Sequence, residues 1–265
     1  MEVVLRIALT FHAERLDTDE VWRRVSQVLA RLERHGVQAT FFCVAPVHPY
    51  YRNRPDFSEA KWVGRINEIA ERGHAIGQHT HFYGVGEEKT RDVAPENLHK
   101  RLDEDRRWLQ AQGFVPTGFI GGGWTISADV FRFLLAHDYK YDCSAHSFDL
   151  AYLKGRGRAL PAQHPFLLGA GSDSLLEIPT TAPIANAVCS LLPFSGQKTY
   201  LDVQSWGRYA LIYLHDYDLL NPKFRVALRV ALHWYRIRGE EFVTVDQLRE
   251  ELSGIHLPMH TLEEI

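Results

Sequence analysis

Short apolar runs alternate along the chain with stretches in which apolar residues recur every three or four positions. Runs of four to nine residues are typical of strands, and the three-to-four-residue period is typical of helices with one buried face. The alternation of the two predicts βαβ units and a parallel sheet. The expected strands cover residues 3–11, 39–44, 74–79, 116–120, 140–143, 175–178 and 209–214, and residues 242–245 lead into the last helix.

The helix expected after the first strand has the clearest pattern. Asp17 and Thr18 can cap its start, and Gly36 can end it. Its apolar positions are Val21, Val25, Val28, Leu29 and Leu32. Further helices are expected at residues 58–72, from about 95 to a stop at Gly113, at 127–137, at 222–238, and after 245. The stretch 144–174 has no regular period, and a loop of that length in a compact domain is usually functional.

Composition indicates an ordinary globular protein. Hydrophobic residues make up 45% and charged residues 24% of 265 residues, and we expect a single domain over residues 1–265. The net charge of −3, from 30 basic and 33 acidic residues, argues against a nucleic acid or an anionic membrane surface as partner. Three scattered cysteines, no recognisable leader and no long apolar span predict a cytoplasmic protein without a membrane span.

Histidines and carboxylates stand where the expected strands end, and in a parallel barrel these ends meet on one face. His79 and His81 are two residues apart, so on an extended segment they point to the same side and can share a divalent metal. Glu14 and His12 are the nearest candidates to complete that site. The alternative is that the histidines only donate and accept hydrogen bonds in a polar barrel mouth.

A second set of residues follows other strands. His215 ends an apolar strand, where an imidazole suits general acid catalysis, and Asp142 is a candidate to orient it. The alternatives are a histidine that caps the next turn and an ordinary turn aspartate. Trp124 follows three glycines, and with Tyr83 it offers aromatic surface for a sugar ring, although packing in the core also accounts for aromatic residues.

Taken in order, the segments at the strand ends resemble the polysaccharide deacetylase family, carbohydrate esterase family 4. The resemblance covers nearly the whole chain, and its specificity comes from the order of the segments. They are Leu9-Thr10-Phe11, the segments 36–42 (GVQATFF), 73–80 (GHAIGQHT) and 118–124 (GFIGGGW), Leu176-Glu177-Ile178-Pro179, and Leu214-His215-Asp216.

This resemblance implies a distorted (β/α)7-type barrel and metal-dependent hydrolysis of an acetamido group. His79 matches the first metal-binding histidine of the family, and His215 matches its general acid. We expect Trp124, Tyr83, Gly122 and Asp216 to contact the substrate, because they lie in or beside the matching segments.

The chain also departs from the family pattern. His12 and Ala13 stand where the family has two successive aspartates, the base and a metal ligand, and Glu14 follows one position later. Tyr83 stands at the position of the second metal histidine, with His81 close by, and Ile120 replaces the arginine that pairs with the base. Loss of both partners of a buried ion pair can be nearly neutral, whereas loss of one leaves an uncompensated charge.

The leading hypothesis is therefore a metal-dependent amide hydrolase that acts on an N-acylated sugar or sugar-like intermediate, a small molecule or an oligosaccharide. Glu14, His79 and His81 would hold the metal, with zinc expected and iron, cobalt or nickel compatible. His12 would be the base or a further ligand, and His215 the acid. The alternatives are an inactive barrel that binds a glycan or nucleotide-sugar, and a metal-independent hydrolase. The sequence does not define an oligomeric state.

Overall fold

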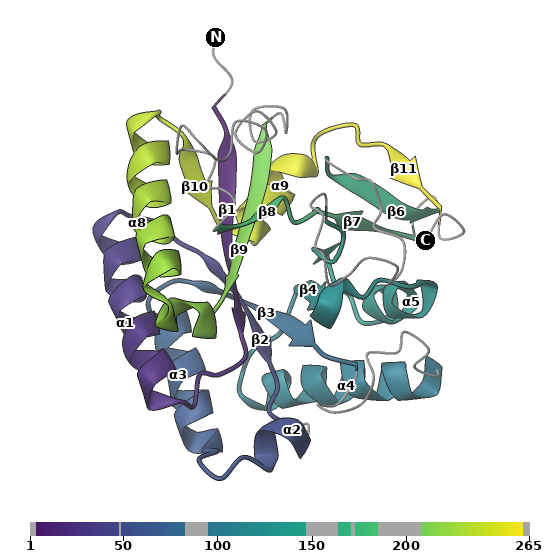
Figure 1. Ribbon diagram of the computed structural model, residues 1–265. Coiled ribbons are helices and arrows are strands. Elements are labelled where there is room, and N and C mark those ends of the chain that lie inside the picture. The colour runs from purple at the N-terminus through teal and green to yellow at the C-terminus, as the bar shows by residue number, and fades with distance from the viewer. Residues whose placement is uncertain are drawn as a thin grey trace.

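The computed structural model describes residues 4–47, 49–82, 95–146, 164–170, 173–184 and 208–261 (Figure 1). Its strands belong to one sheet that curves around a polar interior at one end. They are β1 (Arg6–Ala13), β2 (Thr40–Val44), β3 (Ala75–Thr80), β4 (Gly118–Gly121), β5 (Tyr141–Asp142), β6 (Phe166–Ala170), β7 (Asp173–Glu177), β8 (Ala182–Pro183), β9 (Tyr209–His215), β10 (Glu241–Val243) and β11 (Met259–His260).

The strand order is β11-β6-β7-β5-β4-β3-β2-β1-β9-β8, and β10 pairs with the first residues of β1. Within the described residues, every pair is parallel except the β6–β7 hairpin. Residues 178–181 run from β7 to β8, so the chain connects the last strand of this order with β7, the third strand from the other end. On that path the amide of Thr180 donates to the carbonyl of Ala145, and the amide of Thr181 donates to the carbonyl of Leu211, each at 2.8 Å.

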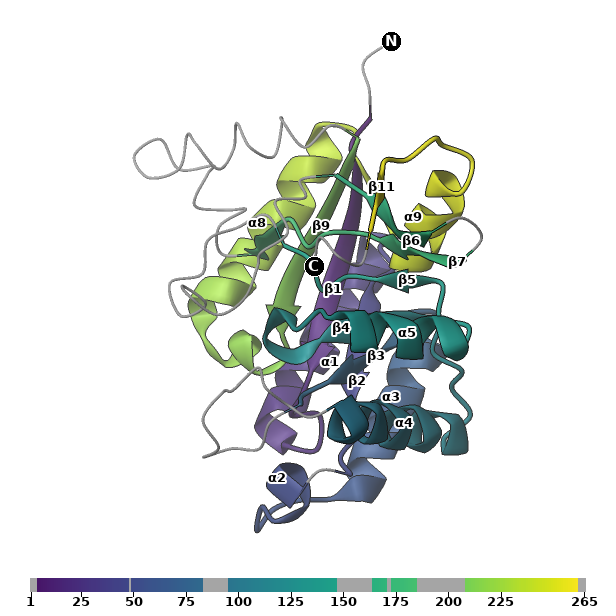
Figure 2. The same ribbon diagram turned by 90° about the vertical axis from the view of Figure 1, so that its right-hand side faces the viewer.

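Helices cover the outside of the sheet. They are α1 (Asp19–Arg34), α2 (Pro49–Arg52), α3 (Glu59–Glu71), α4 (Pro95–Ala111), α5 (Ala128–Ala136), α8 (Pro222–Ile237) and α9 (Val245–Leu252), with short 3-10 turns η1 (Gly122–Trp124) and η3 (Tyr217–Leu220). Figures 1 and 2 show α8, α1 and α3 along one side of β1, β2 and β9, and α4 and α5 beside β3 and β4. No helix in the described part of the chain is long and apolar enough to cross a membrane.

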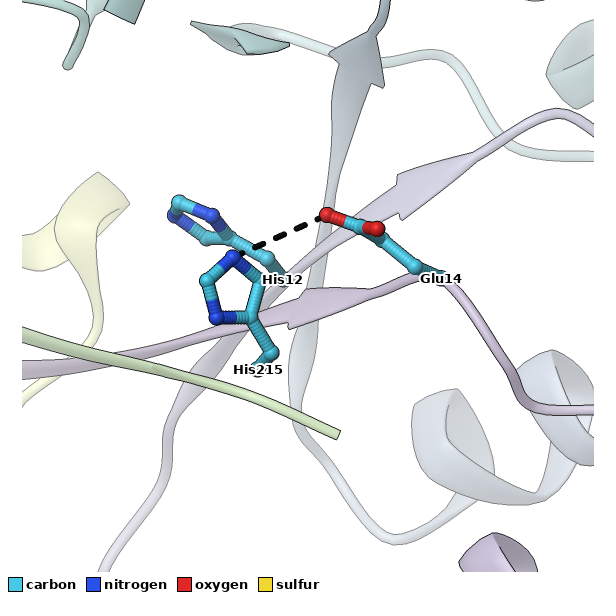
Figure 3. Close-up of side chains that lie close together, drawn as sticks. All are labelled: His12, Glu14 and His215. Carbon is cyan, nitrogen blue, oxygen red and sulfur yellow. Dashed lines mark ion pairs between the residues drawn. The ribbon is translucent and has the colours of Figure 1, made fainter. Parts of the chain in front are cut away.

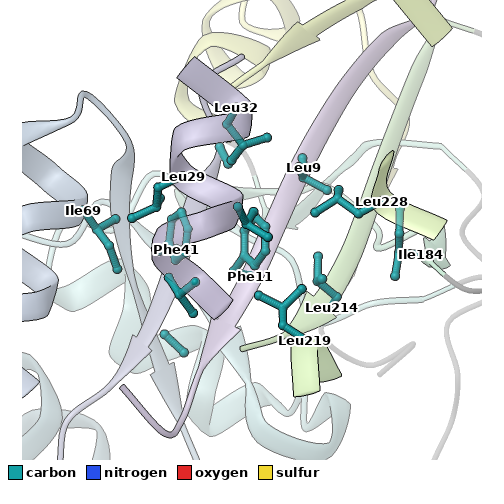
Figure 4. Close-up of a cluster of buried hydrophobic side chains, with 14 of the residues drawn as sticks. Leu9, Phe11, Leu29, Leu32, Phe41, Ile69, Ile184, Leu214, Leu219 and Leu228 are labelled. Atoms are coloured by element: carbon teal, nitrogen blue, oxygen red, sulfur yellow. The ribbon is translucent and has the colours of Figure 1, made fainter. Parts of the chain in front are cut away.

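The largest apolar cluster lies between these outer helices and the outward faces of β1, β2 and β9 (Figure 4). The five apolar positions expected on the first helix are its buried residues, which explains why α1 forms along this surface. Phe11 of β1 and Phe41 of β2 stack with ring centroids 4.5 Å apart in the middle of the cluster. This packing fixes the strands whose ends carry the polar residues.

The architecture confirms the expected distorted (β/α)7-type barrel, with differences in detail. The stretch 144–174, expected to be irregular, contains β6, which pairs with β7. The first strand extends to Ala13 rather than ending at Phe11, because β1 keeps pairing with β2 as far as Cys43. His12 therefore lies on a strand and not in the loop after it.

Candidate active site

Five polar residues meet where β1, β3 and β9 end. β9 lies beside β1 in parallel, and His12 is paired in register with His215. Successive strand residues point to opposite faces, so Ala13 joins the outer apolar cluster while His12 faces the interior. His79 and His81 come from the end of β3, with ring centroids 4.7 Å apart. The sequence-based expectation that these two histidines share one side therefore holds in the structure.

Glu14 is the common partner of this group. Its Oε1 lies 3.3 Å from Nε2 of His79, 3.1 Å from Nε2 of His81 and 3.7 Å from Nε2 of His215. Figure 3 shows Glu14 directed toward the imidazoles of His12 and His215. Two sets, Glu14 with His79 and His81 and Glu14 with His12 and His215, have ligand atoms within 4.8 Å of one another. The structure thus brings together the three residues expected to bind metal.

A hydrogen bond on the far side of the His79 imidazole defines which of its nitrogens faces Glu14 with a lone pair. Nδ1 of His79 lies 2.9 Å from the carbonyl oxygen of Ile120, which can only accept, so the proton of a neutral ring is on Nδ1. Burial is the largest influence on the pKa of His79 and lowers it, so the ring is neutral at pH 7. Nε2 of His79 and the carboxylate oxygen of Glu14 are then two acceptors facing each other, an arrangement that a cation between them would stabilise.

The pKa of Glu14 lies well below its ordinary value. Burial by itself would raise it, but the neighbouring imidazoles of His81, His79 and His215 outweigh burial and lower it. The carboxylate is therefore ionised at neutral pH. Its side chain is 14% exposed, and those of His81 and His215 are about one-quarter exposed, at 24% and 23%. These three form the solvent-facing rim of the site, with His12 and His79 buried beneath them.

His12 lies at the floor among aromatic rings. Its imidazole is 5.1 Å from the ring of Tyr213, 4.8 Å from that of His79 and 5.6 Å from that of Trp124. Burial lowers the pKa of His12 well below its ordinary value, and the nearby histidines lower it further, so the ring is neutral. Its Nε2 is buried without a hydrogen-bond partner in the described structure, so that the nitrogen is available to a ligand or a water.

His215 is held by Asp218, a residue that the sequence analysis did not identify. The Oδ2 atom of Asp218 accepts hydrogen bonds from the backbone amide of His215 at 2.8 Å and from its Nδ1 at 3.1 Å. Burial alone would lower the pKa of His215, but the bond to Asp218 and the charge of Glu14 outweigh it, and the net pKa is raised. The signal for Asp218 in the sequence is only an aspartate three residues after the histidine, in a turn.

The prediction that Asp142 orients His215 is wrong. The Oδ1 atom of Asp142 accepts from the backbone amide of Ser144 at 3.0 Å and from its hydroxyl at 2.5 Å, so the carboxylate is engaged two residues along its own chain. Burial raises the pKa of Asp142 to about 6, and it raises that of neighbouring Glu177 well above its ordinary value. These two carboxyl groups support the wall formed by β5 and β7.

Asp216 does not have the position of a substrate-binding residue. Its side chain is fully buried, and Oδ2 accepts from the backbone amides of Glu14 at 3.0 Å and Arg15 at 2.7 Å, while Oδ1 accepts from the amide of Tyr217 at 2.8 Å. Burial raises the pKa of Asp216 to about 7. Asp216 therefore fixes the turn after β1 and with it the direction of Glu14.

The other expected substrate contacts have different positions. Trp124 has a left-handed backbone with φ 61°, is buried at 8% exposure, and packs its indole behind His12 instead of forming an open aromatic wall. Gly122 lies against His81, because a Cβ there would come within 2.5 Å of His81 Nδ1. Tyr83 lies outside the described residues. Ile120, in place of an arginine, belongs to an apolar cluster with Trp124, so this position does not bury an arginine without its carboxylate partner.

Comparison with known proteins supports the resemblance drawn from the sequence. The family model for polysaccharide deacetylases matches residues 6–120, from the start of β1 into β4. A solved structure from Mycobacterium smegmatis, described as that of a polysaccharide deacetylase, has a TM-score of 0.67 at 18% identity, with 98% of this chain and 94% of that chain covered. No curated protein sequence matches the chain. The chain resembles the polysaccharide deacetylases of carbohydrate esterase family 4 in sequence over this segment and in fold over nearly its whole length.

Two other solved structures have the same fold. A family 4 acetyl xylan esterase from Clostridium thermocellum, in complex with a cobalt ion, has a TM-score of 0.52 at 18% identity, covering 96% of this chain and 97% of that one. A family 4 pseudoenzyme from Bacillus anthracis has a TM-score of 0.57 at 11% identity, covering 97% of this chain and 69% of that one. The fold therefore occurs both in a metal-bound esterase and in a pseudoenzyme.

Proposed function

We propose that the protein is a metal-dependent amide hydrolase that removes an acyl group from an N-acylated sugar or a sugar-like intermediate. One observation carries the proposal: a carboxylate oxygen of Glu14 lies close to imidazole nitrogens that come from two other strands. These nitrogens belong to His79, His81 and His215. The match to the deacetylase family model supports the reaction class.

The residues present fit a divalent metal. Neutral His79, with its proton on Nδ1, offers Nε2 as a ligand, and its bond to the carbonyl of Ile120 is the outer contact that metal-binding histidines usually have. Glu14 and His81 would complete a three-ligand set of the kind that catalytic zinc prefers, and cobalt or iron would accept the same ligands. A divalent cation held there would supply Lewis-acid chemistry, polarising the acyl carbonyl and making a bound water more acidic.

Two further histidines would move protons. His215 is part of the rim, and its raised pKa favours the protonated form, so its Nε2 would donate a proton to the departing amine while Asp218 holds the ring through Nδ1. His12 is neutral and its Nε2 has no partner among the described residues, so it would accept a proton from the attacking water or bind the metal as a fourth ligand. The metal affinity of His12 variants distinguishes the two roles. A ligand role predicts weaker metal binding in these variants, and a role as base predicts unchanged metal binding.

The substrate and the location are part of the same proposal. A small molecule or an oligosaccharide with an acylated amine fits a site whose rim residues, Glu14, His81 and His215, are partly exposed at the barrel mouth. A cytoplasmic location is supported by Cys43 and Cys143, which are buried free thiols.

The first test is metal content, measured by elemental mass spectrometry on purified protein. We expect about one equivalent of divalent metal in the wild type, and loss of that metal together with deacylase activity in His79→Ala and His81→Ala. His256→Ala is the matched control, because His256 is exposed and far along the chain from the site. His215→Ala should keep the metal and slow turnover by about 10²–10⁴-fold.

Other outcomes would assign the chain to a different class. Full deacylase activity in metal-free protein would establish a metal-independent hydrolase. Absence of both metal and activity after supplementation would favour a binding protein for a glycan or nucleotide-sugar, a possibility supported by the fold of the pseudoenzyme and by His12 in place of the usual base. Binding of N-acetylglucosamine oligomers by calorimetry would then identify that class.

A further inference from the structure

The outer face of α8 combines apolar and basic side chains in an unusual way. Four large apolar residues are exposed on it: Val226 at 58%, Val230 at 36%, Trp234 at 38% and Ile237 at 68%. On a helix with 100° between residues these positions fall within an arc of about 80° and extend over about 16 Å. The inward face of the same helix, which includes Leu228 and Leu232, packs into the main core. We call the four exposed residues the α8 stripe.

Basic residues accompany the α8 stripe, and acidic ones do not. From Pro222 to Arg238 the sequence contains five basic residues and no Asp or Glu, although the whole chain has a net charge of −3. Lys223 and Arg229 are exposed, and no ion pair joins either to a carboxylate in the described part of the chain. The charge balance of the whole sequence, which argued against an anionic surface as partner, conceals this local excess of positive charge.

The positive charge continues onto the neighbouring helix. His35, just after α1, has a pKa lowered first by burial and then by the basic groups around it, the arginines Arg236, Arg34 and Arg31 together with His233. The guanidinium of Arg236 donates to the carbonyl of His35 at 2.9 Å, which joins the C-terminal ends of α1 and α8. The α8 stripe thus borders a cationic area that extends over two helices.

We propose that the α8 stripe and its basic border form a docking surface for an anionic lipid bilayer. A helix with exposed Trp, Val and Ile beside Lys and Arg, lying flat on the molecule, has the composition of helices that bind in the interface of a membrane. The four side chains of the stripe are exposed, and α8 lies at the edge of the molecule in Figure 1. A deformable surface such as a bilayer accommodates a ridge of this kind. Charge complementarity selects anionic headgroups, and the basic border disfavours a second copy of the same helix.

The test is co-sedimentation of the full-length protein with vesicles of phosphatidylcholine alone or with about one-third phosphatidylglycerol. Binding to the anionic vesicles only, weakened by about 0.5 M salt, is expected. The double variant Lys223→Glu with Arg229→Glu should have a vesicle–water partition coefficient at least about 25-fold lower than the wild type. Each basic residue near an anionic surface increases this coefficient roughly fivefold. Val230→Ser with Trp234→Ser and Ile237→Ser should lower it about tenfold or more.

Val115→Ser with Lys100→Glu is the matched control, because both residues are exposed and lie at or near α4, away from α8. It should bind anionic vesicles as the wild type does. Thermal unfolding of every variant shows whether it is folded, which these exposed positions should permit. Absence of binding to anionic vesicles, or equal binding by the folded α8 variants, would overturn the proposal. A concentration-dependent dimer in light scattering that the apolar variant abolishes, without vesicle binding, would identify a subunit interface instead.

Discussion

The buried carboxylate of Asp216 provides a sharp test of how Glu14 is positioned. Three backbone amides, those of Glu14, Arg15 and Tyr217, donate to it in an environment without solvent. Each buried donor that loses its acceptor costs about 1–3 kcal/mol. Asp216→Ala should therefore destabilise the protein by about 3–6 kcal/mol, some of which water entering the site would offset. Asp216→Asn keeps one carbonyl oxygen and should cost about 1–3 kcal/mol.

The same substitutions should weaken metal binding, because the turn that Asp216 fixes carries Glu14. Outer contacts that orient metal ligands typically contribute 10–100-fold in affinity or activity. We expect Asp216→Asn to bind zinc 10–100-fold more weakly than the wild type, measured by competition with a chelator of known affinity. Urea unfolding of the metal-free proteins gives the stability change separately. A destabilised Asp216→Asn protein with wild-type zinc affinity would refute the reasoning, because it would show that Glu14 does not depend on this turn.

Two further predictions concern positions around the site. Gly122→Ala should displace His81, because Nδ1 of His81 would lie 2.5 Å from the new Cβ, and elemental analysis should then show less bound metal. Gly64→Ala is the control, since Gly64 has open space around it. Equal metal content in the two variants would contradict the prediction. Burial raises the pKa of Asp142 to about 6 and raises the pKa of Glu177 well above its ordinary value. The protonated carboxyl groups therefore stabilise the fold fully below about pH 4, and this contribution to stability is lost as the pH rises through 6. Glu177→Gln should reduce this loss of stability as the pH rises, measured by urea unfolding at a series of pH values. An unchanged slope would exclude the pair as its source.

Periodicity predicted the elements that pack on one face and missed those without a pattern of their own. α1 was predicted with all of its buried positions because each of them faces β1 or its neighbours. β8 is only two residues long, which is too short to establish an alternation. β6 has five residues, but its sequence FLLGA does not alternate between apolar and polar residues. The hairpin of β6 and β7 is specified by pairing between strands, which single-strand patterns do not contain.

The site was predictable where strand geometry alone determines it. A spacing of two residues puts His79 beside His81, and parallel pairing puts His12 beside His215, whatever the surrounding loops do. The partners of the aspartates were not predictable, because an aspartate after a strand bonds its own turn as readily as a distant histidine. Asp142 bonds locally to Ser144, while Asp218, in an equally ordinary turn, holds the candidate acid.

The departure from the family at the end of β1 is consistent with a rebuilt site. Ala13 points outward into the apolar cluster, and Glu14, one position later, returns a carboxylate to the side of His12. Ile120 puts an apolar side chain where the family has an arginine, and its backbone carbonyl accepts a hydrogen bond from Nδ1 of His79. The Glu14 carboxylate oxygen and the Nε2 atoms of His79 and His81 converge within hydrogen-bond distance, and these ligand atoms suit a divalent metal. This convergence is therefore the strongest physical argument for a cation at this position.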